Sequence, residues 1–504
     1  MEFTKENLKL EDGLKKEWLI TNGMGGFASS TIIGANTRKY HGLLIAPLTP
    51  PARRYLILSK VDESIEIGGK QYNLYTNIGK NYITKGYEYQ TSFEKEEIPT
   101  LKYKISDVEI TKQICMKYGE NTVGILYKIK NGKQPTKLTL APLMNFRDFH
   151  SMSTNHEFKI RQENKGTKLK VIIDNMIQNP IYIKVSEGIY IPHNNDIFRN
   201  MFYIEEQKRG FYPEENHAVV GRYEIEIKPN EEKEISFVCS LEENIDELDV
   251  KKLIIKEKQR ISKILEKTEI DFSEKQDKTE DEEKRQELIK NLVISADTFI
   301  AYRSSFRLHT IIAGYPWFLD WGRDSLISFE GLLLKNKRYD IAKEVLKTMM
   351  RDIKYGLVPN GYSGFDNRPL YNSVDASLLL FEQIQKYLEY TKDQEFIKEI
   401  FEKLEIIIEN YKKGIDIDNN NIYLDTDHLI VSGTENTQNT WMDAKVDGVA
   451  VTPRNGKAVE INSMWYNSLK IMENICKELR RKQKSKKICR TSKTNKKFFW
   501  RQIL

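Results

Sequence analysis

The chain has 504 residues, of which 30% are charged and 39% hydrophobic, a balance typical of a water-soluble globular protein of two or three domains. The net charge of +6 comes from residues 477–504, which hold twelve Lys or Arg and one acid, so it is weak evidence for a nucleic-acid partner. Four cysteines without CxxC spacing, seven histidines and the lack of an apolar leader or a long apolar run predict a cytoplasmic protein with reduced thiols, no metal cluster and no membrane span.

Residues 1–245 are predicted to form an antiparallel β-sandwich. Runs such as "RRYLILSKVDESIEI" and "LKYKISDVEITKQICMKY" alternate polar and apolar residues and are rich in β-branched and aromatic side chains. Turn signals such as Gly68-Gly69 and Asn131-Gly132 separate these runs. Many short strands with no helical period between them favour two packed antiparallel sheets.

A glycine-rich stretch near the start, "WLITNGMGGFASST", contains the Gly23-x-Gly25-x-x-Ala28 spacing of a dinucleotide-binding loop. That loop must be followed by a helix whose N-terminus holds the pyrophosphate. Here the β-branched stretch "STIIGAN" follows instead. The sequence therefore favours a glycine-rich turn between two strands.

The composition changes at about residue 246. Residues 246–284 combine the helical spacing of "DVKKLIIKEKQRISKILEK" with the polar run "DFSEKQDKTEDEEKRQ", and we interpret them as a helical, charged linker. From residue 285 the apolar period is 3.6, which predicts a helical domain over 285–479. Its helices are expected to begin near Leu288 and then to cover about 325–335, 339–354, 375–391, 393–413 and 458–479. Asp324 is the predicted N-cap of the second helix, and Gly414 is the predicted stop of the fifth.

The loop "AGYPWFLDWGRD" precedes this second helix and mixes aromatic with charged residues. Trp faces can pack on the C–H faces of sugar rings, while carboxylates and Arg bind their hydroxyls. A helix-capping loop with aromatic packing and an Asp–Arg pair is the alternative interpretation.

A second loop, "SGTENTQNTWMDAKVDG", places Trp441 two residues before Asp443. An apolar neighbour that removes water raises the pKa of a carboxyl group, as a general acid requires. An exposed turn rich in Asx residues is the alternative. Between the two loops, Asp416–Asp427 has part of the spacing of a calcium loop, although a β-hairpin explains it equally well.

Three stretches of the helical region, "PWFLDWGRDSLISFEGLL", "NTWMDAK" and "TPRNGKAVEINSMWYN", resemble the amylo-α-1,6-glucosidase part of prokaryotic-type glycogen debranching enzymes. The stretch "EWLITNGMGGFASSTIIGANTRKYHGLLIA" is similar to the N-terminal domain of that family. The resemblance implies an N-terminal antiparallel β-sandwich followed by an (α/α)6 toroid. It also implies hydrolysis, with inversion, of the single α-1,6-linked glucose at branch points of glycogen or another branched α-glucan, without a metal or organic cofactor.

The resemblance also carries residue roles onto this sequence. Asp443 matches the general acid of the family. The residues expected to bind the substrate are Trp317, Asp320, Trp321, Arg323 and Asp324 in the first loop, and Trp441, Lys445, Arg454 and Glu460 around the second. An inverting glycosidase also needs a second carboxylate as general base, and no residue of this sequence matches that role.

The C-terminal region departs from the family pattern. A toroid needs twelve helices, whereas the sequence predicts about six after residue 285, and residues 480–504 form a basic stretch that breaks the helical period. We therefore expect a C-terminally truncated, inactive chain with an incomplete toroid and an out-of-frame tail at 480–504. Two alternatives are a non-catalytic glucan-binding protein and a nucleic-acid binder that uses the basic tail, although this tail lacks a groove-reading fold.

Overall fold

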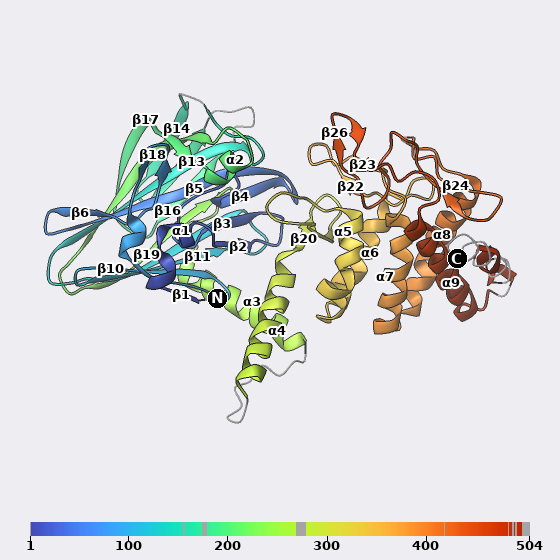
Figure 1. The fold of residues 1–504 in the computed structure, drawn as a ribbon. Coiled ribbons are helices and arrows are strands. Elements are labelled where there is room, and N and C mark those ends of the chain that lie inside the picture. Colours follow the sequence, from blue (N-terminus) through green and yellow to red (C-terminus); the bar gives the residue numbers. More distant parts are fainter. Residues whose placement is uncertain are drawn as a thin grey trace. The chain divides into compact units, whose positions relative to one another are not determined.

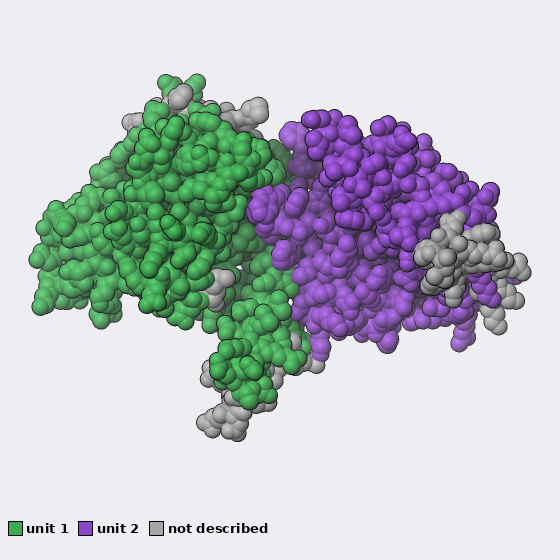
Figure 2. Space-filling model, viewed as in Figure 1, with its two compact units in different colours: residues 1–298 green, residues 299–504 purple. Residues whose placement is uncertain are grey.

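The computed structural model describes residues 2–154, 157–173, 179–268, 279–417, 419–481, 483–485, 488 and 491–495. The chain divides into two compact units, Met1–Thr298 and Phe299–Leu504, which Figure 2 shows in separate colours. Each unit has its own hydrophobic core. Most of the predicted tail, 480–504, lies outside the described residues.

Unit 1 is built mainly from two antiparallel sheets (Figure 1). In the described residues, the first sheet has the order β1 (Glu2–Thr4), β9 (Gln90–Lys95), β10 (Pro99–Ile105), β11 (Val108–Met116), β12 (Thr122–Lys130), β19 (Glu232–Ser240), β16 (Ile181–Val185), β15 (Lys168–Ile173) and β14 (Ile160–Lys165). The second has the order β2 (Glu17–Thr21), β3 (Phe27–Thr31), β4 (Gly42–Thr49), β5 (Ala52–Ile67), β13 (Thr136–Asp148), β18 (Glu214–Ile227), β17 (Ile189–Phe202), β7 (Ile78–Gly79) and β8 (Tyr82–Ile83), and β6 (Lys70–Asn73) pairs with β5. Short helices join the strands: η1 (Lys5–Leu8), α1 (Leu10–Gly13), η2 (Gly86–Tyr89) and α2 (Ile204–Lys208).

The alternating apolar residues of both sheets meet in one core. Ile57 and Leu58 of β5 and Ile110 and Ile114 of β11 belong to the same buried cluster, which is the arrangement of two sheets packed face to face. The expected large antiparallel sheets of the N-terminal region are therefore confirmed.

The glycine residues that were predicted to mark turns do lie in turns. The pair Gly68-Gly69 has φ values of 56° and 83° between β5 and β6, and such values suit a residue without a Cβ atom. Gly23 and Gly25, with φ values of 70° and 90°, lie between the paired strands β2 and β3. The predicted glycine-rich turn is therefore present.

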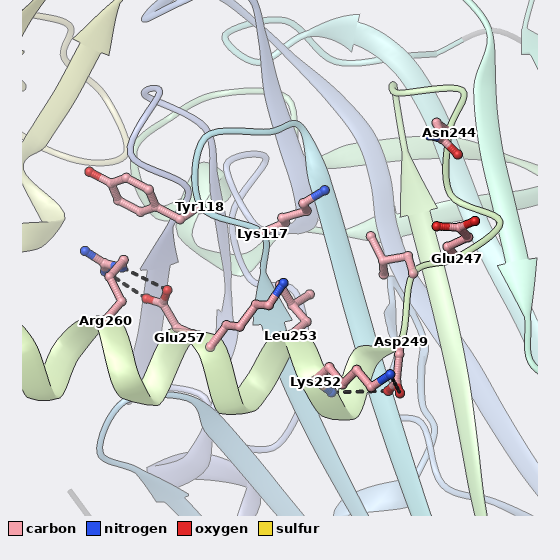
Figure 3. A pocket seen from close by; sticks show the side chains of 11 residues that line it. Lys117, Tyr118, Asn244, Glu247, Asp249, Lys252, Leu253, Glu257 and Arg260 are labelled. Atoms are coloured by element: carbon pink, nitrogen blue, oxygen red, sulfur yellow. Dashed lines mark hydrogen bonds and ion pairs between the residues drawn. The ribbon is translucent and has the colours of Figure 1, made fainter.

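Two helices complete unit 1: α3 (Val250–Lys267), whose N-cap Asp249 accepts a hydrogen bond from the Lys252 N–H, and α4 (Glu280–Thr298). Arg260 of α3 forms an ion pair with Asp297 of α4 at 2.7 Å. A hollow of about 440 Å³ runs along α3 (Figure 3). Tyr118 lines this hollow. The Arg260 guanidinium lies 4.2 Å from the centre of the Tyr118 ring, so the ring already has a packing partner.

Unit 2 is helical, with small hairpins in its connections. Its described α-helices are α5 (Gly322–Phe329), α6 (Tyr339–Arg351), α7 (Ala376–Thr391), α8 (Gln394–Lys413) and α9 (Val459–Glu478), and α5 continues into the π-helical turn η3 (Glu330–Leu334). The hairpins pair β20 (Ile300–Arg303) with β21 (Leu308–Ile311), β22 (Gly361–Tyr362) with β23 (Pro369–Leu370), β24 (Tyr423–Leu424) with β25 (Ile430–Val431), and β26 (Lys445–Val446) with β27 (Val449–Ala450). Helix α7 contacts α5, α6, α8 and α9, and its apolar residues lie at the centre of the core.

The 3.6-residue period located these helices, and the predicted stop at Gly414 is the C-cap of α8, with φ of 101°. The predicted N-cap at Asp324 is wrong. Trp321 is the N-cap of α5, because the Gly322 N–H donates to the Asn360 carbonyl at 2.7 Å and the helix begins there. Asp324 therefore lies inside the first turn. None of the helices in the described residues is long and apolar enough to cross a bilayer.

The segment proposed as a calcium loop begins with an isolated bridge between Ile415 and Ile422, which supports the hairpin interpretation. Asp418, which belongs to this segment, lies outside the described residues.

Candidate active site

Unit 2 contains a cavity of about 400 Å³. Its lining residues are Ala313, Phe318, Trp321, Arg323, Asp324, Asn372, Trp441 and Asp443. Three connections supply them: the segment that leads into α5 together with the first turn of that helix, the segment before α7 and the loop before β26. The two aromatic and charged loops singled out in the sequence, about 120 residues apart, therefore meet at one place.

Arg323 joins these three connections. Its Nε donates to Asp375 Oδ2 at 2.6 Å, its Nη1 to Asp443 Oδ2 at 2.8 Å, and its Nη2 to the Thr440 carbonyl at 2.8 Å. The side chain is buried, which alone would lower its pKa, but the hydrogen bonds and charges of Asp375 and Asp443 outweigh burial and raise the pKa. Arg323 thus carries a fixed positive charge that orients Asp443.

Asp324 is the second carboxylate of the cavity. Its pKa is raised above the ordinary value, because partial desolvation disfavours the anion and because the charges of Asp443 and Asp375 repel it. Its own backbone N–H and Arg323 oppose this shift. Asp324 nevertheless remains open to the cavity, because the helix start at Gly322 turns it outward from the first turn of α5.

The surroundings of Asp443 differ from the expectation of an apolar enclosure. Its side chain is 43% exposed and forms an ion pair with Arg323 at 2.8 Å. Trp441 lines the same cavity but is itself 54% exposed. Trp441 is therefore an open aromatic face beside Asp443 and does not shield the carboxylate from water.

Asp320 is not among the lining residues. It is buried and paired with Arg303 of β20, with 2.9 Å between Nε and Oδ2 and 2.5 Å between Nη2 and Oδ1, and Thr310 donates to its Oδ2 at 3.0 Å. This ion pair ties the hairpin β20–β21 to the segment that leads into α5. Asp320 therefore stabilises the segment that leads into α5 and does not line the cavity.

Trp317 also lies outside the lining set, whereas its neighbour Phe318, 53% exposed, lines the cavity. The sequence analysis missed Phe318, although it stands within the quoted loop. It also missed Asn372, which precedes α7. An asparagine in the segment before a helix gives no signal of its own, because such residues are common in turns.

The remaining predicted residues lie around Trp441. Arg454 forms an ion pair with Glu460, its Nε donating to Glu460 Oε1 at 3.2 Å, and its guanidinium lies 5.7 Å from the centre of the Trp441 ring. Lys445 is exposed on β26. None of these three is among the residues that line the described cavity.

Three buried polar atoms near Arg323 make no hydrogen bond to any described residue: Asn360 Nδ2, Asn372 Oδ1 and Thr440 Oγ1. The same Asn360 side chain accepts from the Arg323 N–H through Oδ1 at 3.4 Å. Buried polar atoms normally have partners. Of these three residues, Asn372 is the one that lines the cavity.

A cavity of the helical unit that combines two carboxylates with aromatic side chains has the groups that hold sugars in proteins. Two family models match the chain: "Glycogen debranching enzyme N terminal" over residues 16–234, and "Amylo-alpha-1,6-glucosidase" over residues 294–502. The chain belongs to the glycogen debranching enzyme family.

The glycogen debranching enzyme of Saccharomyces cerevisiae is 26% identical over 204 residues, which cover 30% of this chain and 13% of the yeast protein. Among solved structures, a bacterial glucoamylase complexed with acarbose matches with a TM-score of 0.50 and 12% identity, over 99% of this chain and 66% of that one. This second match shows likeness of fold alone. A putative kojibiose phosphorylase from the human microbiome has a TM-score of 0.49 and 10% identity, over 99% of this chain and 69% of that one.

Proposed function

We propose that the cavity of unit 2 binds the α-1,6-linked glucose at a branch point of glycogen or a related α-glucan, and that it is the site of an amylo-α-1,6-glucosidase reaction with inversion. The observation that carries this proposal is the meeting of Asp443 and Asp324 with three aromatic residues in one cavity. Membership of the family supports the same substrate class. The helices of unit 2 would then belong to an (α/α)6 toroid.

In this proposal Asp443 is the general acid. It would donate a proton to the glycosidic oxygen as the C–O bond breaks, while water attacks the anomeric carbon from the opposite face and gives its proton to a second carboxylate as general base, a role that no residue of this sequence matches. Arg323 fixes the direction of the carboxyl group through its 2.8 Å contact with Oδ2. A group so held loses little entropy in reaching the reacting oxygen.

The other lining residues would hold the glucose. Trp321, Trp441 and Phe318 offer aromatic faces to the C–H faces of the ring. Asp324 and the side chain of Asn372 face its hydroxyl groups. Asp320 is assigned a positioning role through Arg303, and Trp317, Lys445, Arg454 and Glu460 are assigned to the surroundings of the cavity.

The first prediction tests the acid with Asp443→Asn. Any glucose that the chain releases from a branched limit dextrin should fall at least about 10²-fold, the lower range for loss of a general acid. Turnover of α-glucosyl fluoride should persist, because fluoride leaves without a proton. Affinity for acarbose, measured by calorimetry, should change little.

The matched control is Asp447→Asn, an exposed carboxylate in the same loop with a φ of 49° that Asn also adopts. It should leave turnover and binding unchanged. Near-wild-type release of glucose by Asp443→Asn would show that Asp443 is not the acid. Binding of glucan without any glucose release by the wild-type chain is the result expected both of an incomplete toroid and of the glucan-binding alternative.

A further inference from the structure

One surface of unit 1 presents aromatic and cationic side chains together. It is formed by Lys39, His150, Arg209, Phe211 and Tyr212, and we call it the α2 surface because α2 ends at its centre. Phe211 is 53% exposed and Tyr212 58% exposed. Exposed aromatic side chains that lie together with cationic groups can form a binding surface.

Three segments that are distant in the sequence meet at the α2 surface. The Lys39 ammonium lies 5.6 Å from the centre of the Phe211 ring and donates to the His150 carbonyl at 2.5 Å. The Arg209 guanidinium lies 5.1 Å from the same ring. The loop after β3, the loop after β13 and the turn after α2 therefore form one continuous patch.

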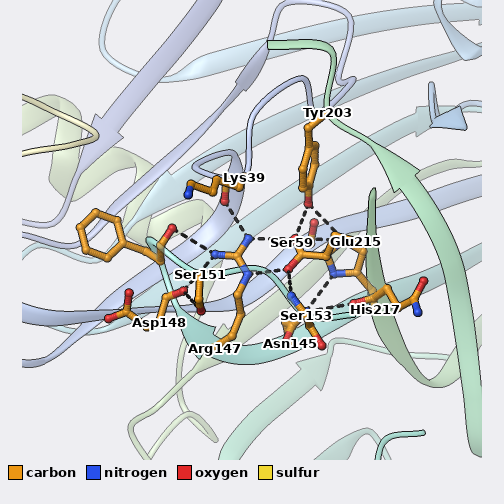
Figure 4. Close-up of polar contacts among 12 residues, drawn as sticks. Lys39, Ser59, Asn145, Arg147, Asp148, Ser151, Ser153, Tyr203, Glu215 and His217 are labelled. Atoms are coloured by element: carbon orange, nitrogen blue, oxygen red, sulfur yellow. Dashed lines mark hydrogen bonds and ion pairs between the residues drawn. The ribbon is translucent and has the colours of Figure 1, made fainter. Parts of the chain in front are cut away.

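A buried polar network around Arg147 and Glu215 reaches the backbone of Lys39 (Figure 4). Arg147 forms a bidentate ion pair with Glu215, at 2.6 and 2.8 Å, and Tyr203 donates to Glu215 at 2.6 Å. Arg147 also donates to the Lys39 carbonyl at 2.7 Å and to the Phe149 carbonyl at 3.2 Å. One guanidinium thus fixes two of the three segments.

This network explains why the surface can be specific. A buried ion pair adds little net stability, because desolvation offsets its attraction. Its clear effect here is to hold the backbones of Lys39 and Phe149 at fixed positions. These backbones in turn set the positions of the Lys39 and His150 side chains. A surface prepared in this way loses less entropy when a ligand binds.

We propose that the α2 surface binds α-glucan chains. Aromatic rings pack on the C–H faces of pyranose rings, and the Lys39 and Arg209 side chains can donate to sugar hydroxyls. A neutral ligand fits better than an anion, because buried Glu206 lies 3.3 Å from Arg209 and offsets its charge. The surface lies within unit 1, whereas the cavity with Asp443 lies in unit 2. This inference rests on the proposed function, which supplies the glucan.

The test compares affinities of the 504-residue chain for glycogen in native affinity gels. The double variant Phe211→Ala with Tyr212→Ala should lose about tenfold in affinity, as two aromatic contacts predict, without a change in melting temperature. Tyr212→Phe keeps the ring and should bind as the wild type does. Ile189→Ala, which trims another exposed apolar side chain of unit 1, is the control for surface truncation.

Unchanged affinity in the double variant would overturn the proposal. The proposal would also be overturned if the double variant bound more weakly than the wild type at low salt but equally well at high salt. The surface would then contribute through its charge, as an anion site does. Trp441→Ala, in the cavity of unit 2, separates the two proposals. If only Trp441→Ala weakens glucan binding, the proposed function stands and the α2 surface does not; if the wild-type chain binds no glucan, both fall.

Discussion

Arg323 illustrates how the role of a residue changes once its neighbours are known. The sequence predicts it as a substrate contact, and the structure shows a buried cation between Asp375 and Asp443, at 2.6 and 2.8 Å. Its removal leaves Asp375, itself only 3% exposed, without its cationic partner, although Ser373 still donates to it. The substitution therefore affects folding as well as binding.

We predict that Arg323→Ala lowers the free energy of unfolding by about 3–5 kcal/mol, the usual cost of breaking a buried ion pair. Arg454→Ala removes a more exposed arginine, paired with Glu460, and should cost about 1 kcal/mol or less. Urea denaturation followed by circular dichroism measures both. Equal losses in the two variants would show that the Arg323 pairs contribute no more than a surface pair.

His217 gives unit 1 a dependence on pH. Burial disfavours the imidazolium and lowers the pKa of His217 to about 4, although Glu215 opposes the shift. The unfolded chain binds this proton near the ordinary pKa of about 6.5. The stability of unit 1 is therefore fully present above that value and declines as the pH falls towards 4, by up to about 3 kcal/mol in total.

We predict that His217→Gln flattens this decline between pH 6.5 and 4, whatever its effect at neutral pH. Thermal unfolding at a series of pH values measures the slope. The control is His193→Gln, because His193 is partly exposed, 2.8 Å from Arg222. The prediction fails if His217→Gln keeps the wild-type slope.

The candidate site could be predicted only in part from its residues. The mixed loops identified Trp321, Arg323, Asp324, Trp441 and Asp443, because aromatic and charged residues together suit neither a core nor a solvated loop. The inward turn of Asp320 could not be predicted, because its partner Arg303 belongs to a short hairpin without a sequence signal. The choice of Phe318 over Trp317 depends on the path of the backbone.

At the scale of elements, the start of α5 decides where the site residues point. Gly322 begins this helix against the segment before β22, and a Cβ atom added to it would lie 2.6 Å from the Pro359 carbonyl oxygen. That atom is backbone and cannot move alone. Sequence periodicity gave the helix but missed its first turn, because a tertiary hydrogen bond to Asn360 sets the boundary.

We predict that Gly322→Ala lowers the melting temperature, and with it the affinity for glucan proposed for the cavity, since α5 must move away from Asn360. Gly331→Ala is the control, because its added Cβ meets no atom within 4 Å. In that helical turn Ala should stabilise by about 0.5–1 kcal/mol relative to Gly. If both variants were stabilising, the contact between α5 and the Pro359 segment would not be tight.

For the whole molecule, the change of apolar period from two to 3.6 predicted the change from sheets to helices. This works because each period defines one buried face, and the two units bury their faces in separate cores. The boundary between the units, at residue 298, follows α4 and not the polar run before it. Helical periodicity alone does not say which core a helix joins.

Because the cores are separate, we predict that a destabilising substitution in one unit leaves the unfolding of the other unchanged. Phe237 lies in the core of unit 1 and Phe381 in the core of unit 2, and both are fully buried. Replacing either with Ala should cost about 3–5 kcal/mol within its own unit. In differential scanning calorimetry, Phe237→Ala should lower one transition and Phe381→Ala the other. Because the same substitution is made in each core, each variant is the control for the other. A single transition that both variants shift equally would show that the two units unfold together.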